Sequence, residues 1–332
     1  MNRKALIYFI LSIFIGQTLA VEYSLGDKSG DIFGKVEHIR VHYEDTLIEI
    51  ARKYSLGYEE LIRVNKGVDP WLPGEGTEVL IPGMRLLTLG EREGIIVNLP
   101  EHRLYFFPKK VEGQPPKVFT FPVSVGKMDW QTPIGATRII EKRKNPTWIP
   151  PESVRKEHAA LGELPLPAFI GPGSDNPLGA YALRLDIPGA YLIHGTNNPD
   201  AVGMAVTHGC LRMFPEDIER LFAMVTIGTR VNLINEPLKM VMHNGELWIE
   251  VHPPVDSQGQ TTKAKLEDFE KRLEVMLDKL QFAINWDIAL EALREASGIP
   301  ALIGLELVPE ILPVQEVGSI SNQSDVVSTV NR

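Results

Sequence analysis

The sequence has a single cysteine, Cys210, among 332 residues. One cysteine cannot form an internal disulfide, and it excludes four-cysteine zinc sites and C-x-x-C redox pairs. Positive charge is also scarce, since 34 Lys and Arg stand against 43 Asp and Glu, for a net charge of -9. A non-specific nucleic-acid binder needs a basic surface, so no nucleic-acid partner is expected. The 44% hydrophobic and 23% charged residues are typical of a globular protein and exclude wholesale disorder and a polytopic membrane protein.

The one long apolar run lies at the N-terminus. Arg3 and Lys4 precede the apolar stretch Ala5–Ile15, and Thr18 and Ala20 form a small-x-small cleavage pattern. These three parts predict a signal peptide over residues 1–20. The run is shorter than the ~20 residues that span a bilayer, although an uncleaved anchor is an alternative. The protein is therefore expected to work outside the cytoplasm, where an unpaired cysteine needs a function.

A small α+β module is predicted over residues 38–83. Ile39–Tyr43 alternates like a strand, and Asp45 and Thr46 then cap a helix with apolar residues at helical spacing. Tyr58–Val64 has the pattern of a second helix, and Val79–Pro82 that of a closing strand. The expected order is strand, helix, helix, strand.

This module resembles the LysM module. The resemblance lies in "VHYEDTLIEIARKYSLGYEELIRVN", the loop Asn65–Pro70 and the final "VLIP". It implies binding of N-acetylglucosamine-containing glycans of peptidoglycan through two loops that include Asp45, Thr46, Val68 and Trp71. An exposed indole can stack on a sugar face, but Trp71 equally suits a plug against the next domain. A LysM fold that only packs on its neighbour remains the alternative.

A mostly β domain is predicted over residues 93–236. Ile95–Leu99 and Arg103–Phe107 read as a hairpin, and Lys117–Val125 alternates as a third strand. Further strands are expected at 138–141 and 180–185. The stretch 145–176 is dense in proline and glycine, which predicts a long irregular loop that is either functional or a solvated connector.

The chemistry-bearing residues lie between 191 and 214. Cys210 follows His208 and Gly209, and a helix is expected to open at Pro215. His194 ends a predicted buried strand. Nearby positive charge and a helix dipole both lower a thiol's pKa, so we expect Cys210 to favour the nucleophilic thiolate. Gly209 lets the backbone turn sharply, so that neighbouring N–H groups can converge on an oxyanion.

Each of these residues has a plainer interpretation. Cys210 is also compatible with an inert core position, and His194 with a satisfied core histidine. His194, His208 and Cys210 together fit an incomplete zinc ligand set. Arg212 fits a structural ion pair with either of the two acidic residues at the start of the next helix.

The motif "IHGTN…VTHGCLRM" resembles the signature of the YkuD-type L,D-transpeptidases, over about residues 95–234. This family remodels bacterial peptidoglycan through a cysteine acyl-enzyme. The resemblance implies that Cys210 is the nucleophile, that His194 is the general base, and that the Gly195 carbonyl orients His194. It assigns the oxyanion hole to the N–H groups of Gly209 and Cys210, shaped by His208. It assigns substrate binding to Arg212, Thr207 and Asn197, with no metal and no cofactor.

The resemblance also implies a periplasmic enzyme and a reaction. The donor is a tetrapeptide stem cut at the diaminopimelate–D-Ala bond, and the acceptor is another stem's diaminopimelate or a lysine-ended lipoprotein. An L,D-carboxypeptidase or other hydrolase with the same site is one alternative, and a non-catalytic LysM wall-binding protein is another. Because the motif lies wholly beyond residue 190, deleting Ile39–Pro82 is expected to weaken wall binding but to spare attack on soluble stem peptides.

The C-terminal part is predicted as a hairpin and helices. Residues 237–255 form a hairpin turned at His243–Gly245, since Asn-Gly is a strong hairpin signal. Apolar spacing predicts a helical extension over 262–310, broken near Trp286. Residues 311–332 are expected to be a flexible tail. The predicted fold class is therefore multidomain: an α+β LysM module, a mostly β catalytic domain and a helical C-terminal extension.

Overall fold

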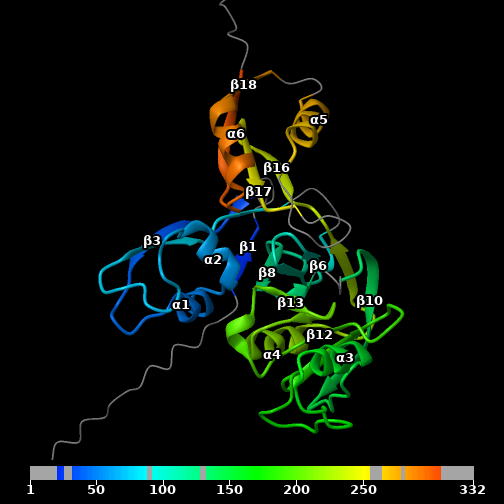
Figure 1. The fold of residues 1–332 in the computed structure, drawn as a ribbon. Coiled ribbons are helices and arrows are strands. Elements are labelled where there is room, and N and C mark those ends of the chain that lie inside the picture. Colours follow the sequence, from blue (N-terminus) through cyan, green and yellow to red (C-terminus); the bar gives the residue numbers. More distant parts are fainter. Residues whose placement is uncertain are drawn as a thin grey trace, which may run out of the picture.

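A computed structural model of the protein describes residues 21–25, 32–87, 92–127, 132–254, 264–277 and 281–307. The predicted signal peptide and C-terminal tail lie outside these residues. Three units meet at one junction: a small α+β module, a larger β-rich domain and a C-terminal α+β unit (Figure 1). Among the helices in the described ranges, none is long and apolar enough to cross a lipid bilayer.

The small module has the predicted order of elements: β3 (Val36–Arg40), α1 (Leu47–Lys53), α2 (Tyr58–Val64) and β4 (Glu78–Pro82). Thr46 caps α1, because its hydroxyl accepts from the Glu49 N–H while the Glu49 carboxylate accepts from the Thr46 N–H. Leu47, Leu61 and Val79 fill the core between the helices and the sheet.

The first strand lies three residues earlier than predicted. β3 ends at Arg40, because the Asp45 carboxylate accepts from the His42 N–H at 2.8 Å and closes a turn there. The sequence missed two short elements that join this module to the rest. They are the strand β1 (Val21–Ser24), which pairs with β8 (Lys117–Pro122), and the ribbon of β2 (Ile32–Phe33) with β5 (Arg85–Leu86).

The β-rich domain is built on a nine-stranded sheet of order β1-β8-β7-β6-β15-β10-β11-β12-β14. Its other strands are β6 (Gly94–Asn98), β7 (Arg103–Phe107), β8 (Lys117–Pro122), β10 (Gly135–Lys144), β11 (Tyr181–Leu185), β12 (Leu192–His194), β14 (Leu211–Arg212) and β15 (Arg230–Ile234). Strand β10 turns the sheet, because its first half pairs with β15 and its second half with β11, across a bulge. The largest apolar core lies against this sheet and beneath α4 (Pro215–Met224), and a smaller apolar cluster around Tyr105 and Phe107 also includes residues of the sheet.

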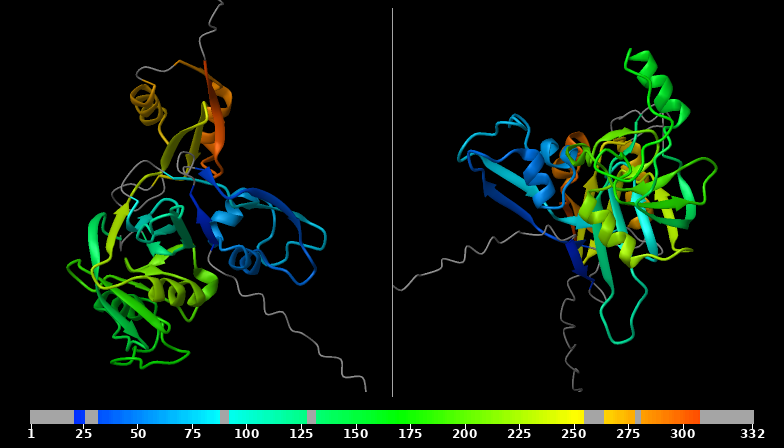
Figure 2. Two further views of the ribbon diagram at one scale, coloured as in Figure 1. Left: turned by 180° about the vertical axis from the view of Figure 1, so that it is seen from behind. Right: turned by 90° about the horizontal axis from the view of Figure 1, so that it is seen from below.

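The proline- and glycine-rich stretch is less irregular than predicted. It contains the helix α3 (Glu152–Ala160), which lies at the end of the domain opposite the C-terminal unit (Figures 1 and 2). No residue of α3 is buried. The expectation of a long loop failed here because the prolines at 150 and 151 precede the helix start rather than interrupt it.

The C-terminal unit is a four-stranded sheet of order β16-β17-β19-β18 with two helices packed on it. The predicted hairpin is present as β16 (Leu238–His243) and β17 (Glu246–Val251). Asn244 and Gly245, with φ of 51° and 77°, make its turn. Both helices are present, as α5 (Leu266–Met276) and α6 (Trp286–Glu295). The sequence missed β18 (Phe282–Ile284) and β19 (Ala301–Glu306), so the extension is not purely helical.

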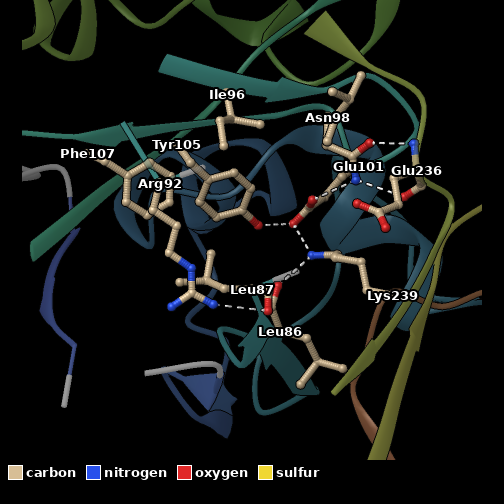
Figure 3. A pocket seen from close by; sticks show the side chains of 11 residues that line it. Leu86, Leu87, Arg92, Ile96, Asn98, Glu101, Tyr105, Phe107, Glu236 and Lys239 are labelled. Atoms are coloured by element: carbon tan, nitrogen blue, oxygen red, sulfur yellow. Dashed lines mark hydrogen bonds and ion pairs between the residues drawn. The ribbon is translucent and has the colours of Figure 1, made fainter. Parts of the chain in front are cut away.

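Two groups of buried ion pairs join the three units, and the first lies between the β-rich domain and the C-terminal unit. Lys239 of β16 contacts Glu101, which follows β6, at 3.0 Å and Glu250 of β17 at 2.5 Å. The Tyr105 hydroxyl donates to the same Glu101 carboxylate (Figure 3). Glu250 also accepts from His252 at 2.6 Å and from the Leu86 N–H at 2.5 Å. Glu101, Lys239 and Glu250 are almost completely buried.

The second group of buried ion pairs joins the small module to the β-rich domain. Arg85 of β5 and Arg103 of β7 both pair with Glu60 of α2. Arg103 also donates to the Ser55 carbonyl at 3.2 Å. Each of the three cations in the two groups is therefore paired with a carboxylate.

Candidate active site

Two short parallel strands hold the predicted nucleophile and base. In the pairing of β12 with β14, Ile193 lies opposite Leu211 and His194 opposite Arg212. Ile193 and Leu211 are buried in the main core. Because side chains alternate along a strand, His194 and Arg212 point to the opposite face of this ribbon. Cys210 directly precedes β14 and is half-buried, so a substrate can reach its thiol.

The turn at Gly209 has the conformation that the sequence analysis expected. Gly209 has φ of 91°, a region that favours glycine. The Thr207 hydroxyl donates to the Cys210 carbonyl at 2.6 Å, and the Thr132 hydroxyl donates to the Gly209 carbonyl at 3.0 Å. Within the part of the chain that the structure describes, no group accepts from the N–H of Gly209 or Cys210. The turn is thus fixed through its carbonyls while both N–H groups stay available.

His194 is held as a neutral base. Its Nδ1 lies 2.6 Å from the Gly195 carbonyl, which is the contact that the family resemblance implies. Burial, and then the charge of Arg212, lowers the pKa of His194 to about 3. The imidazole is therefore uncharged at neutral pH. With Nδ1–H donating to the carbonyl, Nε2 carries the lone pair that can accept a proton.

Cys210 differs from the expectation of a ready thiolate. Burial raises the pKa of its thiol, and a backbone hydrogen bond with Leu192 and the Arg212 charge only partly oppose this. The thiol lies 3.6 Å from the Ala190 carbonyl, to which it donates. The expected pKa lowering fails because α4 begins five residues after Cys210 and because His208 faces another partner. The resting pair is thus a thiol beside a neutral imidazole.

His208 connects the turn at Gly209 to α3. Its Nε2 lies 2.6 Å from the Glu157 carboxylate, and its Nδ1 lies 3.2 Å from the Ser153 hydroxyl. Glu157 also forms an ion pair with Lys127. Both ring nitrogens of His208 are therefore engaged by α3, which does not fit a zinc site shared with His194 and Cys210.

Another cluster has the composition of a metal site. Among the described residues, one group of three potential ligands lies close together, namely Glu101, Glu250 and His252. The Lys239 ammonium, however, contacts both carboxylates. A cation of the protein itself thus occupies the position that a metal ion would need.

Arg212 and Asn197 are placed differently. The Arg212 backbone pairs with Ser124, at 2.8 and 3.1 Å, while its guanidinium lies near Cys210 and His194. Its Nε is buried without a hydrogen-bond partner among the described residues. Glu216, one of its expected ion-pair partners, pairs with Arg52 of α1. Asn197 is exposed, two residues after Gly195.

The two predicted glycan-binding loops of the small module lie side by side. The Leu47 N–H donates to the Pro70 carbonyl at 2.9 Å and joins them. Trp71 is 61% exposed, which contradicts the alternative of a plug against the next domain. Val68 packs against the module's own core. Asp45 closes the turn at His42, and Thr46 caps α1. Both residues therefore have a structural role, to which a contact with a glycan would be an addition.

Comparisons with known proteins assign the small module and the β-rich domain to known families. The LysM domain profile matches residues 39–82, and the YkuD profile, described as the L,D-transpeptidase catalytic domain, matches residues 92–233. The probable L,D-transpeptidase YbiS of Escherichia coli K12 is 36% identical over 86% of this chain and 93% of its own. The chain belongs to the L,D-transpeptidase family. The probable L,D-transpeptidase YcfS of the same strain is 38% identical over 73% of this chain and 73% of its own. The probable L,D-transpeptidase ErfK/SrfK of that strain is 34% identical over 91% of this chain and 97% of its own.

Four residues that the sequence analysis missed contact the site of this L,D-transpeptidase: Thr132, Ser124, Glu157 and Lys127. Thr132 and Lys127 lie on either side of residues 128–131, which the structure does not describe. Ser124 ties two parts of the site together, because its hydroxyl donates to the Ala201 carbonyl at 2.7 Å while its backbone pairs with Arg212. No local pattern marks these residues, since each reaches the catalytic turn from a distant part of the chain.

Proposed function

We propose that the protein is a periplasmic L,D-transpeptidase that works through a thioester at Cys210. It cleaves the diaminopimelate–D-Ala bond of a tetrapeptide stem and transfers the acyl group to an amine. The observation that supports the proposal is the pairing of β14, which Cys210 directly precedes, with β12, which ends at His194. His194 is neutral, and its Nδ1 lies 2.6 Å from the Gly195 carbonyl. A cysteine, a neutral base and a group that orients the base are what nucleophilic acyl transfer requires.

The acylation step moves one proton and exchanges one bond. The S–H bond turns from the Ala190 carbonyl to Nε2 of His194, which takes the proton as Sγ attacks the donor carbonyl carbon. The N–H groups of Gly209 and Cys210 stabilise the oxyanion, and loss of one such donor typically costs about 2.7–4 kcal/mol. The C–N bond then breaks, His194 returns the proton to the leaving D-Ala amine, and a thioester remains.

The second step makes a new amide without ATP. The acceptor amine attacks the thioester, His194 takes its proton, and the Cys210 sulfur leaves and is reprotonated. The acceptor is a lysine-ended lipoprotein or another stem's diaminopimelate. The Arg212 guanidinium, with its unpartnered Nε, would bind a stem carboxylate. The LysM domain would bind the glycan, with Trp71 stacking on a sugar.

The test uses disaccharide-tetrapeptides, with and without a lysine-ended peptide, and mass spectrometry of the products. We expect free D-Ala, a stem mass added to Cys210, and a stem–lysine or stem–stem product. Cys210→Ala should abolish all three, and His194→Ala should slow D-Ala release by roughly 10²–10⁴-fold. In a parallel assay, Trp71→Ala should reduce sedimentation with purified peptidoglycan. Tripeptide alone, with no amine adduct, would identify a carboxypeptidase, and turnover by folded Cys210→Ala would exclude the proposed mechanism.

A further inference from the structure

Both ends of the segment that carries the nucleophile contact the LysM domain. We define the catalytic segment as residues 202–216, which include Thr207, His208, Gly209, Cys210 and Arg212. At its upstream end, the Tyr58 N–H of α2 donates to the Val202 carbonyl at 3.1 Å. The Ala205 N–H donates to the Glu59 carboxylate of α2 at 3.4 Å. The LysM helix thus supplies both a donor and an acceptor to this end.

The two backbones approach closely at a pair of glycines. A Cβ built on Gly203, whose φ is 88°, would lie 2.3 Å from the Gly57 Cα. No side chain fits between them, so α2 sets the position of the chain two residues before strand β13 (Ala205–Thr207). His102 completes this contact, with Nδ1 2.9 Å from the Gly203 carbonyl and 3.7 Å from the Glu59 carboxylate.

At the downstream end, Arg52 of α1 binds Glu216 with two hydrogen bonds, of 2.8 and 2.9 Å. The Arg52 guanidinium also lies over the Phe214 ring, 5.5 Å from its centroid. Phe214 is the N-cap residue of α4 and follows Arg212 by two positions. A bidentate arginine fixes direction as well as distance, because its fork and the carboxylate must be coplanar.

Between these contacts the catalytic segment is held by two short strands and by the hydroxyl contacts of Thr132 and Thr207. Strand β13 is three residues long and β14 is two. The N–H groups of Gly209 and Cys210, which would form the oxyanion hole, lie in the turn between these strands. A displacement of either end would therefore move those donors, and a misplacement of ~1 Å in an active site can cost about 10²-fold in rate.

We infer that the LysM domain positions the catalytic segment, with Arg52 and Glu59 as the positioning residues. The inference rests on the proposed function and adds a role for LysM besides glycan binding. It revises the expectation that deleting Ile39–Pro82 would spare attack on soluble stem peptides. That expectation treated the module and the site as independent, whereas the contacts connect them within four to eight residues of the nucleophile.

The experiment compares Arg52→Gln and Glu59→Gln with matched controls on the same domain. Arg40→Gln and Glu78→Gln make the same charge changes on exposed residues of β3 and β4. Each full-length variant is assayed with a soluble disaccharide-tetrapeptide, well below its unfolding temperature. We expect kcat to fall roughly tenfold for Arg52→Gln and Glu59→Gln, with KM within about twofold of the parent. Arg52→Lys should recover part of the loss, and binding to purified peptidoglycan should stay unchanged.

Alkylation of Cys210 by iodoacetamide gives a readout that needs no substrate. The rate should change at least about twofold in Arg52→Gln and Glu59→Gln, and not in the two controls. Unchanged kcat and alkylation, or equal losses in the controls, would overturn the inference. If the parent protein releases no D-Ala, the proposed function fails, and the alkylation rates still decide whether LysM positions the turn.

Discussion

Burial sets the protonation of Cys210 and His194, the proposed nucleophile and base. The dipole of a helix acts within its first turn and is worth about 0.3–1 kcal/mol there. Helix α4 begins at Pro215, outside that range from Cys210. Burial therefore determines both pKa shifts: it raises the pKa of the Cys210 thiol and lowers that of His194 to about 3. His194 is consequently neutral, as the proposed mechanism requires of its base.

This protonation predicts how Cys210 reacts with pH. The thiolate reacts with iodoacetamide, and its fraction rises about tenfold per pH unit below the pKa of the thiol. Because burial raises this pKa above its ordinary value, the alkylation rate should still be rising at the pH where the rate of a free thiol levels off. His194 titrates near 3, so its protonation should add no step between pH 5 and 8.

The protein unfolded in urea is the control, since labelling is confined to the single cysteine in both states. Its rate should level off near the ordinary pKa of a free thiol, about 8.5. A native rate that is flat from pH 5 to 8 would instead show a stable thiolate–imidazolium pair and contradict the assignment.

Among the elements, those with local signals could be predicted from the sequence. Thr46 with Glu49 marks the start of α1, Pro215 that of α4, and Asn244-Gly245 the hairpin turn. Strand β18 could not be predicted, because Ile284 continues the helical spacing of α5. Only its pairing with β19 makes this segment a strand. The motif identified Cys210, His194 and Gly195, while the groups that fix the turn come from remote segments.

Helix α3 illustrates an element held by polar contacts. None of its residues is buried, so packing contributes little to its attachment. Arg155 donates to the carbonyls of Leu166 and Pro167 within the same stretch. Glu157 joins the helix to the site through His208 and Lys127, which hold the pKa of this carboxyl below its usual range.

We predict that Glu157→Gln loosens α3. Glutamine keeps the shape but loses the charge that pairs with Lys127. Because the Glu157 side chain is 38% exposed, the pair is worth about 0.5–1 kcal/mol. Proteolysis or hydrogen exchange within residues 145–176 should therefore accelerate by about two- to fivefold.

The control for this change lies one turn earlier on the same helix. Glu152 is exposed, and its carboxylate lies 3.9 Å from the Lys156 ammonium in the same helix. Glu152→Gln should leave the exchange rate of 145–176 near that of the parent. Equal acceleration in both variants would show that helix propensity, rather than the contact with His208, retains α3.

At the scale of the whole molecule, two groups of buried ion pairs connect the three units. Arg103 of the catalytic domain pairs with Glu60 of LysM, and Lys239 of the C-terminal unit pairs with Glu101 of the catalytic domain and with Glu250. Such pairs need not stabilise the fold more than apolar residues would, but breaking one of them leaves a buried charge unpaired. Each group therefore makes the catalytic domain depend on one neighbouring unit.

Lys239→Met tests this dependence. The change leaves Glu101 and Glu250 buried without their shared ammonium, so the free energy of unfolding should fall by about 3–5 kcal/mol at pH 7. Lys117→Met removes a half-buried lysine that pairs with Glu22 and should cost within about 1 kcal/mol. Denaturant unfolding, followed by the tryptophan fluorescence of all units, measures both.

The pH dependence of the Lys239→Met deficit distinguishes lost charge pairing from lost packing. Burial raises the pKa of Glu101, and Lys239, His252 and Arg85 outweigh it and lower the pKa to about 2. In the parent, this carboxylate stabilises the fold above pH 4.5, and the contribution disappears as pH falls towards 2. Without Lys239, burial dominates, so the Glu101 carboxyl binds a proton more tightly in the folded state than in the unfolded state, and lowering the pH stabilises the folded variant. The loss in free energy of unfolding should therefore be smaller at pH 5 than at pH 7. A loss that is constant with pH would mean that the lost methylene packing, and not the unpaired carboxylate, destabilises the variant.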